Sequence, residues 1–266
     1  MLEITSFSNE KVKFASGLKE KKNRIRFNQI FIEGYREILR GSESDLKFTS
    51  LYISPECFLG ENEDSLIDTL KLKDSQIFRL PRKVFEKISM RDRPDGLIAL
   101  AETPEVRKLS TSTLIGDLFL VIEGVEKPGN FGTILRTAEG AGVDAVILMD
   151  PKLDLFNPNV IRASTGTLFS MPIYQNSWEE CNRIFTSKKV QVLAVTPEGK
   201  SQYYRENLKK PTVLLYGSEQ YGLSDEIRAS DVKKVNIPML GKADSLNLAM
   251  SVGIVLYETI RQRDMS

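Results

Sequence analysis

The sequence EGVEKPGNFGTILRTAEGAG, residues 123–142, lies between two apolar runs, LFLVI at residues 118–122 and VDAVILM at residues 143–149. Short apolar runs bounded by turn residues are typical of buried strands, and a turn cluster followed by a longer segment is typical of a loop that enters a helix. We therefore predict strand, loop, helix and strand in that order. Units of this kind build α/β folds with a parallel sheet.

The start of this predicted helix carries polar side chains whose role the local sequence leaves open. Pro128 and Gly129 favour a turn, and Asn130 is expected to cap the helix by accepting a backbone N–H of its first turn. Arg136 is expected in the second turn, close enough to Asn130 to share a site with it. The same segment is also compatible with a capped helix that carries a surface pair between Arg136 and Glu139.

Strand-like and helix-like segments alternate along the rest of the chain, which again favours an α/β fold. Strands are predicted at residues 28–34, 48–54, 76–80, 96–102, 118–122, 143–149, 171–174, 190–195, 212–216 and 234–237. A long helix is predicted at residues 245–261. Residues 104–113 are polar and lack periodicity, so we predict an N-terminal domain at 1–103, a linker at 104–113 and a C-terminal domain at 114–266.

Composition excludes several classes of function. The 266 residues include no histidine, which removes the Ser-His-Asp triad and any histidine-ligated metal site, and we expect no bound metal. Cys57 and Cys181 have no CxxC context and are interpreted as small buried side chains. The sequence contains no run of about 20 apolar residues and no signal-peptide pattern, so we expect a cytoplasmic protein without membrane contact.

Basic residues are concentrated near the N-terminus, although the net charge is only +1. Within residues 11–26 they are Lys11, Lys13, Lys19, Lys21, Lys22, Arg24 and Arg26, with Glu20 as the acidic neighbour. Such a cluster is able to neutralise several phosphates, which predicts a local nucleic-acid contact. A solvated helix face would give the same pattern.

Two further loops follow predicted strands. TVLLYG leads into GSEQYGLS at residues 217–224, which carries Glu219, and KVNIPM leads into LGKADSLNLAMS at residues 240–251. Ligands bind at the carboxyl ends of parallel strands, so the three loops are expected to converge on one cleft. None of them matches GxGxxG or the phosphate-cradling GxxxxGK[ST] pattern, which argues against a generic nucleotide-binding enzyme.

Together and in order, these segments resemble the SpoU (TrmH-type) family of RNA ribose 2′-O-methyltransferases in the SPOUT superfamily. The residues that fall on family motif positions are Asn130 and Arg136, then Gly217 and Glu219, then Ser245, Leu246 and Asn247. Residues 157–173 resemble the middle segment of the family, with Arg162 and Ser164 on its polar positions. The family usually has SLNVS where this chain has SLNLA, so Ala249 departs from the commoner serine. Residues 1–103 more distantly resemble the substrate-recognition domain of longer members.

The resemblance implies a SPOUT domain with a deep trefoil knot, S-adenosylmethionine as cofactor, and a homodimer whose interface involves the last helix. It implies a structured RNA as substrate, with large-subunit ribosomal RNA favoured by the N-terminal domain. A transfer-RNA methyltransferase and a non-catalytic RNA-binding protein on the same fold remain alternatives. The implied catalytic residues are Asn130, Arg136, Glu219, Ser245 and Asn247. The implied cofactor-binding residues are Gly217, Ile237, Met239 and Leu246, and the expected RNA-binding residues are Lys19, Lys21, Lys22, Arg24, Arg26 and Arg162.

Methyl transfer to a 2′-hydroxyl needs no metal, but the hydroxyl must lose or share its proton. Arg136 remains protonated in proteins, so we interpret it as a partner of the neighbouring phosphate that stabilises charge on the 2′-oxygen. A phosphate oxygen or water then accepts the proton. Asn130 would orient the ribose or Arg136, and Glu219 would hold Arg136 or accept the proton.

Overall fold

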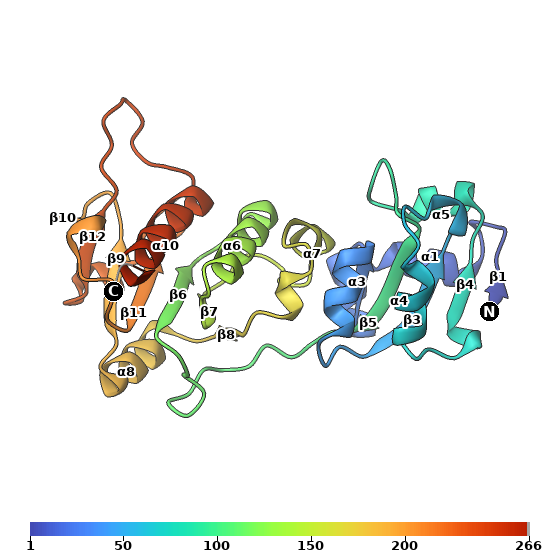
Figure 1. Cartoon of the computed structure of the whole chain (residues 1–266), viewed down its shortest axis with the longest axis horizontal. Coiled ribbons are helices and arrows are strands. Elements are labelled where there is room, and N and C mark those ends of the chain that lie inside the picture. The colour runs from blue at the N-terminus through green and yellow to red at the C-terminus, as the bar shows by residue number, and fades with distance from the viewer. Residues whose placement is uncertain (265–266) are drawn as a thin grey trace. The chain divides into compact units, whose positions relative to one another are not determined.

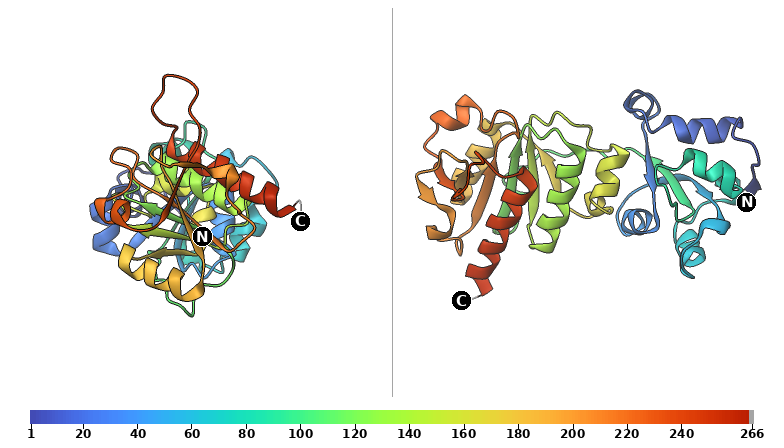
Figure 2. Two further views of the ribbon diagram at one scale, coloured as in Figure 1. Left: turned by 90° about the vertical axis from the view of Figure 1, so that its left-hand side faces the viewer. Right: turned by 90° about the horizontal axis from the view of Figure 1, so that it is seen from above.

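A computed structural model provides the structure of the protein and describes residues 1–264 (Figures 1 and 2). The chain forms two compact units. The first consists of Met1–Glu105 and Asp154–Ser170, and the second consists of Val106–Leu153 with the described residues from Met171 onward. Residues 154–170 therefore belong to the first unit although they lie in sequence between two strands of the second.

The first unit is a mixed α/β structure. Its strands form one sheet in the order β1-β4-β3-β5-β2, in which β1, β4 and β3 are parallel and β5 is antiparallel to both β3 and β2. Its elements are β1 (Leu2–Glu3), α1 (Glu10–Gly17), α2 (Lys21–Phe27), β2 (Gln29–Glu33), α3 (Tyr35–Ser42), β3 (Phe48–Ile53), η1 (Pro55–Cys57), α4 (Glu63–Thr69), η2 (Asp74–Gln76), β4 (Ile77–Arg79), α5 (Arg82–Ile88), β5 (Leu97–Glu102), α7 (Pro158–Ala163) and η3 (Thr167–Phe169).

Residues 154–170 are attached to the first unit by polar contacts as well as by packing. α7 lies against β2, and η3 lies against α3. The buried guanidinium of Arg24 pairs with Asp154 at 2.5 Å, and Arg40 donates to the Thr167 hydroxyl at 2.5 Å. Arg24 also donates to the carbonyl oxygens of Leu18 and Lys19. All three nitrogen atoms of the Arg24 guanidinium thus form hydrogen bonds inside this unit.

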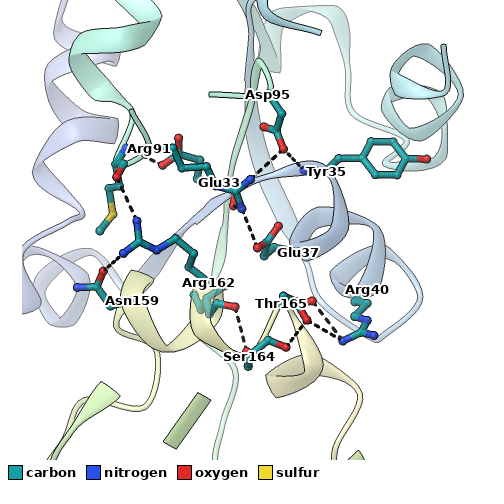
Figure 3. Close-up of polar contacts among 12 residues, drawn as sticks. Glu33, Tyr35, Glu37, Arg40, Arg91, Asp95, Asn159, Arg162, Ser164 and Thr165 are labelled. Atoms are coloured by element: carbon teal, nitrogen blue, oxygen red, sulfur yellow. Dashed lines mark hydrogen bonds and ion pairs between the residues drawn. The ribbon is translucent and has the colours of Figure 1, made fainter. Parts of the chain in front are cut away.

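A second polar cluster joins β2 and α3 to the loop before β5 (Figure 3). Arg91 pairs with Glu37 at 2.7 Å and with Asp95 at 3.2 Å, and Asp95 accepts the backbone N–H of Tyr35 at 2.8 Å. Burial raises the pKa of Glu37, while the nearby Arg91 acts in the opposite direction. The buried carboxylates of Glu37 and Asp95 therefore each have a cationic or N–H partner. Such a partner offsets the free-energy cost of burying a charge.

The second unit is built on a sheet of seven parallel strands in the order β10-β12-β9-β11-β6-β7-β8. Its elements are β6 (Leu118–Glu123), α6 (Pro128–Gly140), β7 (Ala145–Met149), β8 (Ile173–Gln175), α8 (Trp178–Lys188), β9 (Gln191–Val195), β10 (Ser201–Gln202), η4 (Tyr203–Arg205), β11 (Thr212–Tyr216), α9 (Asp225–Ala229), β12 (Lys233–Asn236) and α10 (Leu248–Asp264). This arrangement confirms the predicted α/β class with a parallel sheet, and the knot stays a prediction.

Helices cover both faces of this sheet. Alternate residues of β6, Phe119 and Val121, share a core cluster with Phe185 of α8 and Ile227 of α9. Residues of opposite parity face the other side, because side chains alternate along a strand. There α6 and α10 lie next to each other, as the ribbon views also show (Figures 1 and 2).

Most predicted strands are found within one or two residues of their expected bounds. Two short strands, β1 and β10, were not predicted, because two residues give no readable pattern. The last helix begins at Leu248 rather than at residue 245, because the Asn247 side chain accepts the backbone N–H of Ala249 at 2.9 Å and so starts the helix. Cys57 and Cys181 are free and buried as predicted, and burial raises the pKa of Cys181 to about 12.

No helix within residues 1–264 is both long and apolar enough to cross a membrane. In the same residues, no three acidic or cysteine side chains gather in a way that would hold a metal ion.

Candidate active site

A cavity of about 600 Å³ lies in the second unit, where the loops after β9, β11 and β12 meet. It is lined by Lys127, Val195, Thr196, Pro197, Glu198, residues 216–223, Arg228, Ile237, Met239, residues 244–248 and Ser251. The strands are parallel, so these loops all leave the sheet at its carboxyl edge. The convergence expected from the sequence is present in the structure, with the loop after β9 as an additional member.

The loop after β11 is a tight turn. The backbone groups of Ser218 and Gly222 bond to each other in both directions, at 2.8 and 3.0 Å. A Cβ added to Gly217 would lie 2.1 Å from the carbonyl carbon of Gly222, so this position requires glycine for the turn itself. Glu123, at the end of β6, accepts the backbone N–H of Ser224 at 2.8 Å and ties the turn to the neighbouring strand.

Four polar side chains form a line of contacts beside the cavity. Lys127 pairs with one carboxylate oxygen of Glu219 at 2.6 Å, and Asn130 donates to the other at 2.7 Å. Asn247 in turn donates to the amide oxygen of Asn130 at 3.2 Å. The Glu219 side chain is only 12 % exposed. Both its oxygens are thus occupied, and the orientation of the Asn130 amide is fixed from two sides.

The structure corrects two expectations for α6. The helix begins at Pro128 with Lys127 in the cap position, so Asn130 lies inside the first turn and its amide contacts Glu219 instead of capping. Proline at the first helical position explains the difference, because its fixed φ already suits a helix. Arg136 consequently lies in the third turn rather than the second.

Arg136 is exposed, and within residues 1–264 it makes neither a hydrogen bond nor an ion pair. The alternative of a surface pair with Glu139 is therefore not found, and Glu219 holds Lys127 and Asn130 instead of Arg136. Along an α-helix six residues advance by about 9 Å and turn by about 240° relative to the start. Asn130 and Arg136 therefore point in different directions.

The other residues expected around the cofactor lie together. Gly217, Ile237, Met239 and Leu246 all line the cavity, and so does Ser245, which was expected among the catalytic residues. The side chain of Ala249, which departs from the family pattern, is buried in α10.

Sequence reasoning missed Lys127 and the loop TPEG at residues 196–199, which adds Thr196, Pro197 and Glu198 to the cavity wall. The signal was present, because TPEG also follows an apolar strand and contains both proline and glycine.

The sequence profile described as the SpoU rRNA methylase family matches residues 117–257, which include the whole of this site. The chain belongs to the SpoU family. This finding confirms the resemblance drawn from the three loops. A second profile, described as an MRM3-like substrate binding domain, matches residues 9–99.

Relatives of this SpoU chain span nearly its whole length. It is 27 % identical over 257 residues to the 23S rRNA (guanosine(2553)-2′-O)-methyltransferase RlmP of Bacillus subtilis, covering 97 % of this chain and 98 % of the relative. The AdoMet-bound rRNA methyltransferase from Sinorhizobium meliloti aligns with a TM-score of 0.84 at 31 % identity, covering 97 % of both chains. The SpoU methyltransferase AviRb from Streptomyces viridochromogenes, in complex with AdoMet, aligns with a TM-score of 0.83 at 25 % identity, over 97 % of this chain and all of the other.

The basic residues predicted to contact RNA lie in the first unit of this SpoU protein and differ in their environment. Lys21, Lys22 and Arg26 are exposed on α2. Lys19 is half-buried and donates to the Ser89 carbonyl oxygen at 3.1 Å, and burial lowers its pKa against the raising effect of Glu33.

Two arginines complete the predicted set. Arg162 is exposed on α7 and donates to the Met90 carbonyl oxygen at 3.2 Å. Arg24 is 3 % exposed, so the interpretation of this residue as a phosphate contact is wrong for this structure. The physical reason is its pairing with Asp154, a residue 130 positions away that no local pattern indicates.

Two apolar side chains on α2 were not singled out from the sequence. Ile25 is 70 % exposed and Phe27 is 41 % exposed, and both lie among the exposed basic residues of that helix. The Arg26 guanidinium lies 5.0 Å from the centre of the Phe27 ring. Basic residues interleaved with an exposed aromatic ring are typical of surfaces that bind single-stranded RNA.

Proposed function

We propose that this protein transfers the methyl group of S-adenosylmethionine to a ribose 2′-oxygen in 23S ribosomal RNA. The observation that carries the proposal is the line of contacts from Lys127 through Glu219 and Asn130 to Asn247, formed beside the cavity by three loops of a SpoU domain. Support for the substrate comes from full-length relatives whose names describe 23S rRNA 2′-O-methyltransferases, such as those of Bacillus subtilis and Streptomyces viridochromogenes.

The residues around the cavity fit S-adenosylmethionine. Val195, Ile237 and Met239 provide apolar walls suited to a purine ring. The carboxylates of Glu198 and Asp244 suit a ligand that carries a sulfonium and an ammonium group. When bound, this cofactor supplies an electrophilic methyl group. We assign its nucleoside to the groups around Gly217, Ile237, Met239 and Leu246.

The side chains have distinct proposed roles. Arg136 lies on another side of α6 from Asn130 and outside the cavity wall, so it is assigned to an RNA phosphate next to the target nucleotide. Glu219 already accepts from Asn130 and Lys127, which favours positioning of these two groups over proton abstraction. The proton of the 2′-hydroxyl passes to a phosphate oxygen or to water. Ser245 and Asn247, in the loop after β12, also line the cavity.

The first unit is proposed to hold the structured RNA through Lys21, Lys22, Arg26 and Arg162, each of which is exposed. We propose residues 1–103 as the RNA-binding domain, 104–113 as the linker and 114–266 as the methyltransferase domain, whose residues 154–170 pack in the first unit. The protein is proposed to act in the cytoplasm and without a metal ion.

A homodimer through α10 is also proposed. Met250 and Tyr257 are 62 % and 56 % exposed, and residues seven apart lie on one face of a helix. Sedimentation of the wild-type protein and of a Met250→Lys/Tyr257→Lys variant tests this assignment. A monomeric wild-type protein would contradict it.

The function is tested by incubating the full chain with labelled S-adenosylmethionine and unmodified 23S rRNA, followed by mapping of 2′-O-methyl positions. We expect one or a few modified riboses in 23S rRNA and none in 16S rRNA. Modification of transfer RNA alone would favour the tRNA alternative. Tight RNA binding without any transfer would favour a non-catalytic RNA-binding protein.

A further inference from the structure

Tyr221 is an exposed aromatic side chain at the wall of the cavity. It is 70 % exposed, and it lines the cavity two residues after Glu219. Two residues span at most about 7 Å of chain, so the Cα atom of Tyr221 lies within that distance of the Cα atom of Glu219. None of the roles proposed above uses this ring.

The backbone that carries Tyr221 is held rigidly. Its N–H donates to the Ser218 hydroxyl at 3.0 Å, and its carbonyl oxygen accepts from Arg228 at 3.0 Å. The paired backbone bonds between Ser218 and Gly222 close the turn on both sides of it. The ring is therefore exposed on a fixed support, and little order would have to be gained when it binds a partner.

Aromatic side chains in this setting suit nucleobases. Proteins that act on single nucleotides of RNA hold unstacked bases on aromatic faces, and every base offers such a face. A ribose placed beside Asn130 and Glu219 brings its own base to the same wall of the cavity. A tyrosine also buries a large area at low cost in side-chain entropy, because it has only two rotatable bonds.

We propose that Tyr221 stacks on the base of the nucleotide whose ribose is methylated, and thereby positions that nucleotide and contributes to substrate choice. This inference rests on the proposed function. Since stacking needs only the ring, phenylalanine is expected to replace tyrosine and alanine is not. Loss of one stacked base weakens binding by about ten- to a hundredfold.

The test compares Tyr221→Ala and Tyr221→Phe with a matched control, Tyr204→Ala, in the full chain. Tyr204 is a 43 % exposed tyrosine of the same unit that does not line the cavity. We expect Tyr221→Ala to raise the KM for 23S rRNA by about ten- to a hundredfold. Tyr221→Phe and Tyr204→Ala are expected to remain near wild type. Affinity for S-adenosylmethionine, measured by calorimetry, should be the same in all four proteins.

A second measurement separates stacking from a general disturbance of the loop. An RNA fragment that carries the mapped nucleotide is prepared with and without the base at that position. Removal of the base should weaken wild-type turnover strongly and should have little further effect on Tyr221→Ala. Equal losses in both proteins would overturn the inference.

Two other outcomes also contradict it. An unchanged KM for RNA in Tyr221→Ala would show that the ring has no such contact, and a weakened affinity for S-adenosylmethionine would assign the ring to the cofactor. If wild-type protein transfers no methyl group to RNA, the proposed function fails and this inference fails with it. An active wild-type enzyme with a normal Tyr221→Ala variant refutes only the inference.

Discussion

α2 of the first unit and α6 of the second each carry an arginine that was predicted from the sequence to contact RNA. The two arginines differ in burial. Arg24 on α2 is buried and bonds to Asp154 and to two backbone carbonyl oxygens. Arg136 on α6 is exposed. A cluster of basic residues in a sequence therefore does not show which of its members is buried in the folded protein.

Helix geometry explains how one cation of the cluster is enclosed. At about 100° per residue, Lys21, Lys22, Ile25 and Arg26 occupy a continuous arc of about 140°, whereas Arg24 points about 60° outside it. The basic residues on the exposed arc remain available to bind phosphate. Arg24 instead bonds to Asp154 and to backbone carbonyl oxygens inside the protein. Substitutions at the buried and at the exposed positions test this separation.

Substitution of Arg24 by alanine is expected to destabilise the protein by about 3–5 kcal/mol, because it leaves the partly buried carboxylate of Asp154 without its partner. Chemical denaturation measures the change in the free energy of unfolding. Lys21→Ala, on the exposed arc of the same helix, should change it by less than about 0.5 kcal/mol. Equal stability of the two variants would place Arg24 on the surface.

Arg136→Ala is expected to lower the kcat for RNA methylation by about a hundredfold, since it removes the cation assigned to the phosphate that positions the target ribose. The free energy of unfolding and the affinity for S-adenosylmethionine should hardly change, because Arg136 is exposed and does not line the cavity. Arg136→Lys should also fail, because an ammonium group does not replace the planar fork on phosphate. Near-normal turnover of the lysine variant would refute that contact.

Replacement of Lys21, Lys22 and Arg26 by glutamate is expected to weaken RNA binding by about a hundredfold at moderate salt. Each lost phosphate contact lowers the slope of log affinity against log salt by roughly 0.7–0.9. Titrations at several salt concentrations measure that slope, and thermal unfolding serves as the control for stability. An unchanged slope would mean that α2 is only a solvated face.

The smallest of these effects is expected for Glu219→Gln, which should lower kcat by about tenfold. The substitution keeps the shape of the side chain but removes the charge that pairs with Lys127 and strengthens the bond from Asn130. Hydrogen bonding to Glu219 raises the pKa of Lys127, so this lysine should titrate nearer its ordinary range in the variant. Glu139→Gln on the exposed part of α6 is the matched control. A fully inactive Glu219→Gln variant would instead favour Glu219 as the proton acceptor.

Patterns that are local in the chain could be predicted from the sequence, and contacts between distant residues could not. The runs that became β6, β7, β9 and β11 were recognisable because each consists mainly of apolar residues and lies between turn or loop residues. Asn130 and Glu219 were found through motifs, but their contact joins residues 89 positions apart. The ion pair between Lys127 and Glu219 and the burial of Arg24 depend on similar long-range contacts.

The location of Asp154–Ser170 has a consequence for dividing the chain into fragments. This segment lies within the stretch matched by the SpoU profile, yet it packs in the first unit through α7 and η3. Val160, Ile161 and Leu168 are buried in the whole chain. In a fragment that begins at residue 114 their side chains would be exposed to solvent, because the rest of the first unit would be missing. A fragment of residues 1–103 would lack the same piece. Complementation is therefore the natural experiment: a synthetic peptide of residues 154–170, added in trans, is expected to rescue folding of the N-terminal fragment.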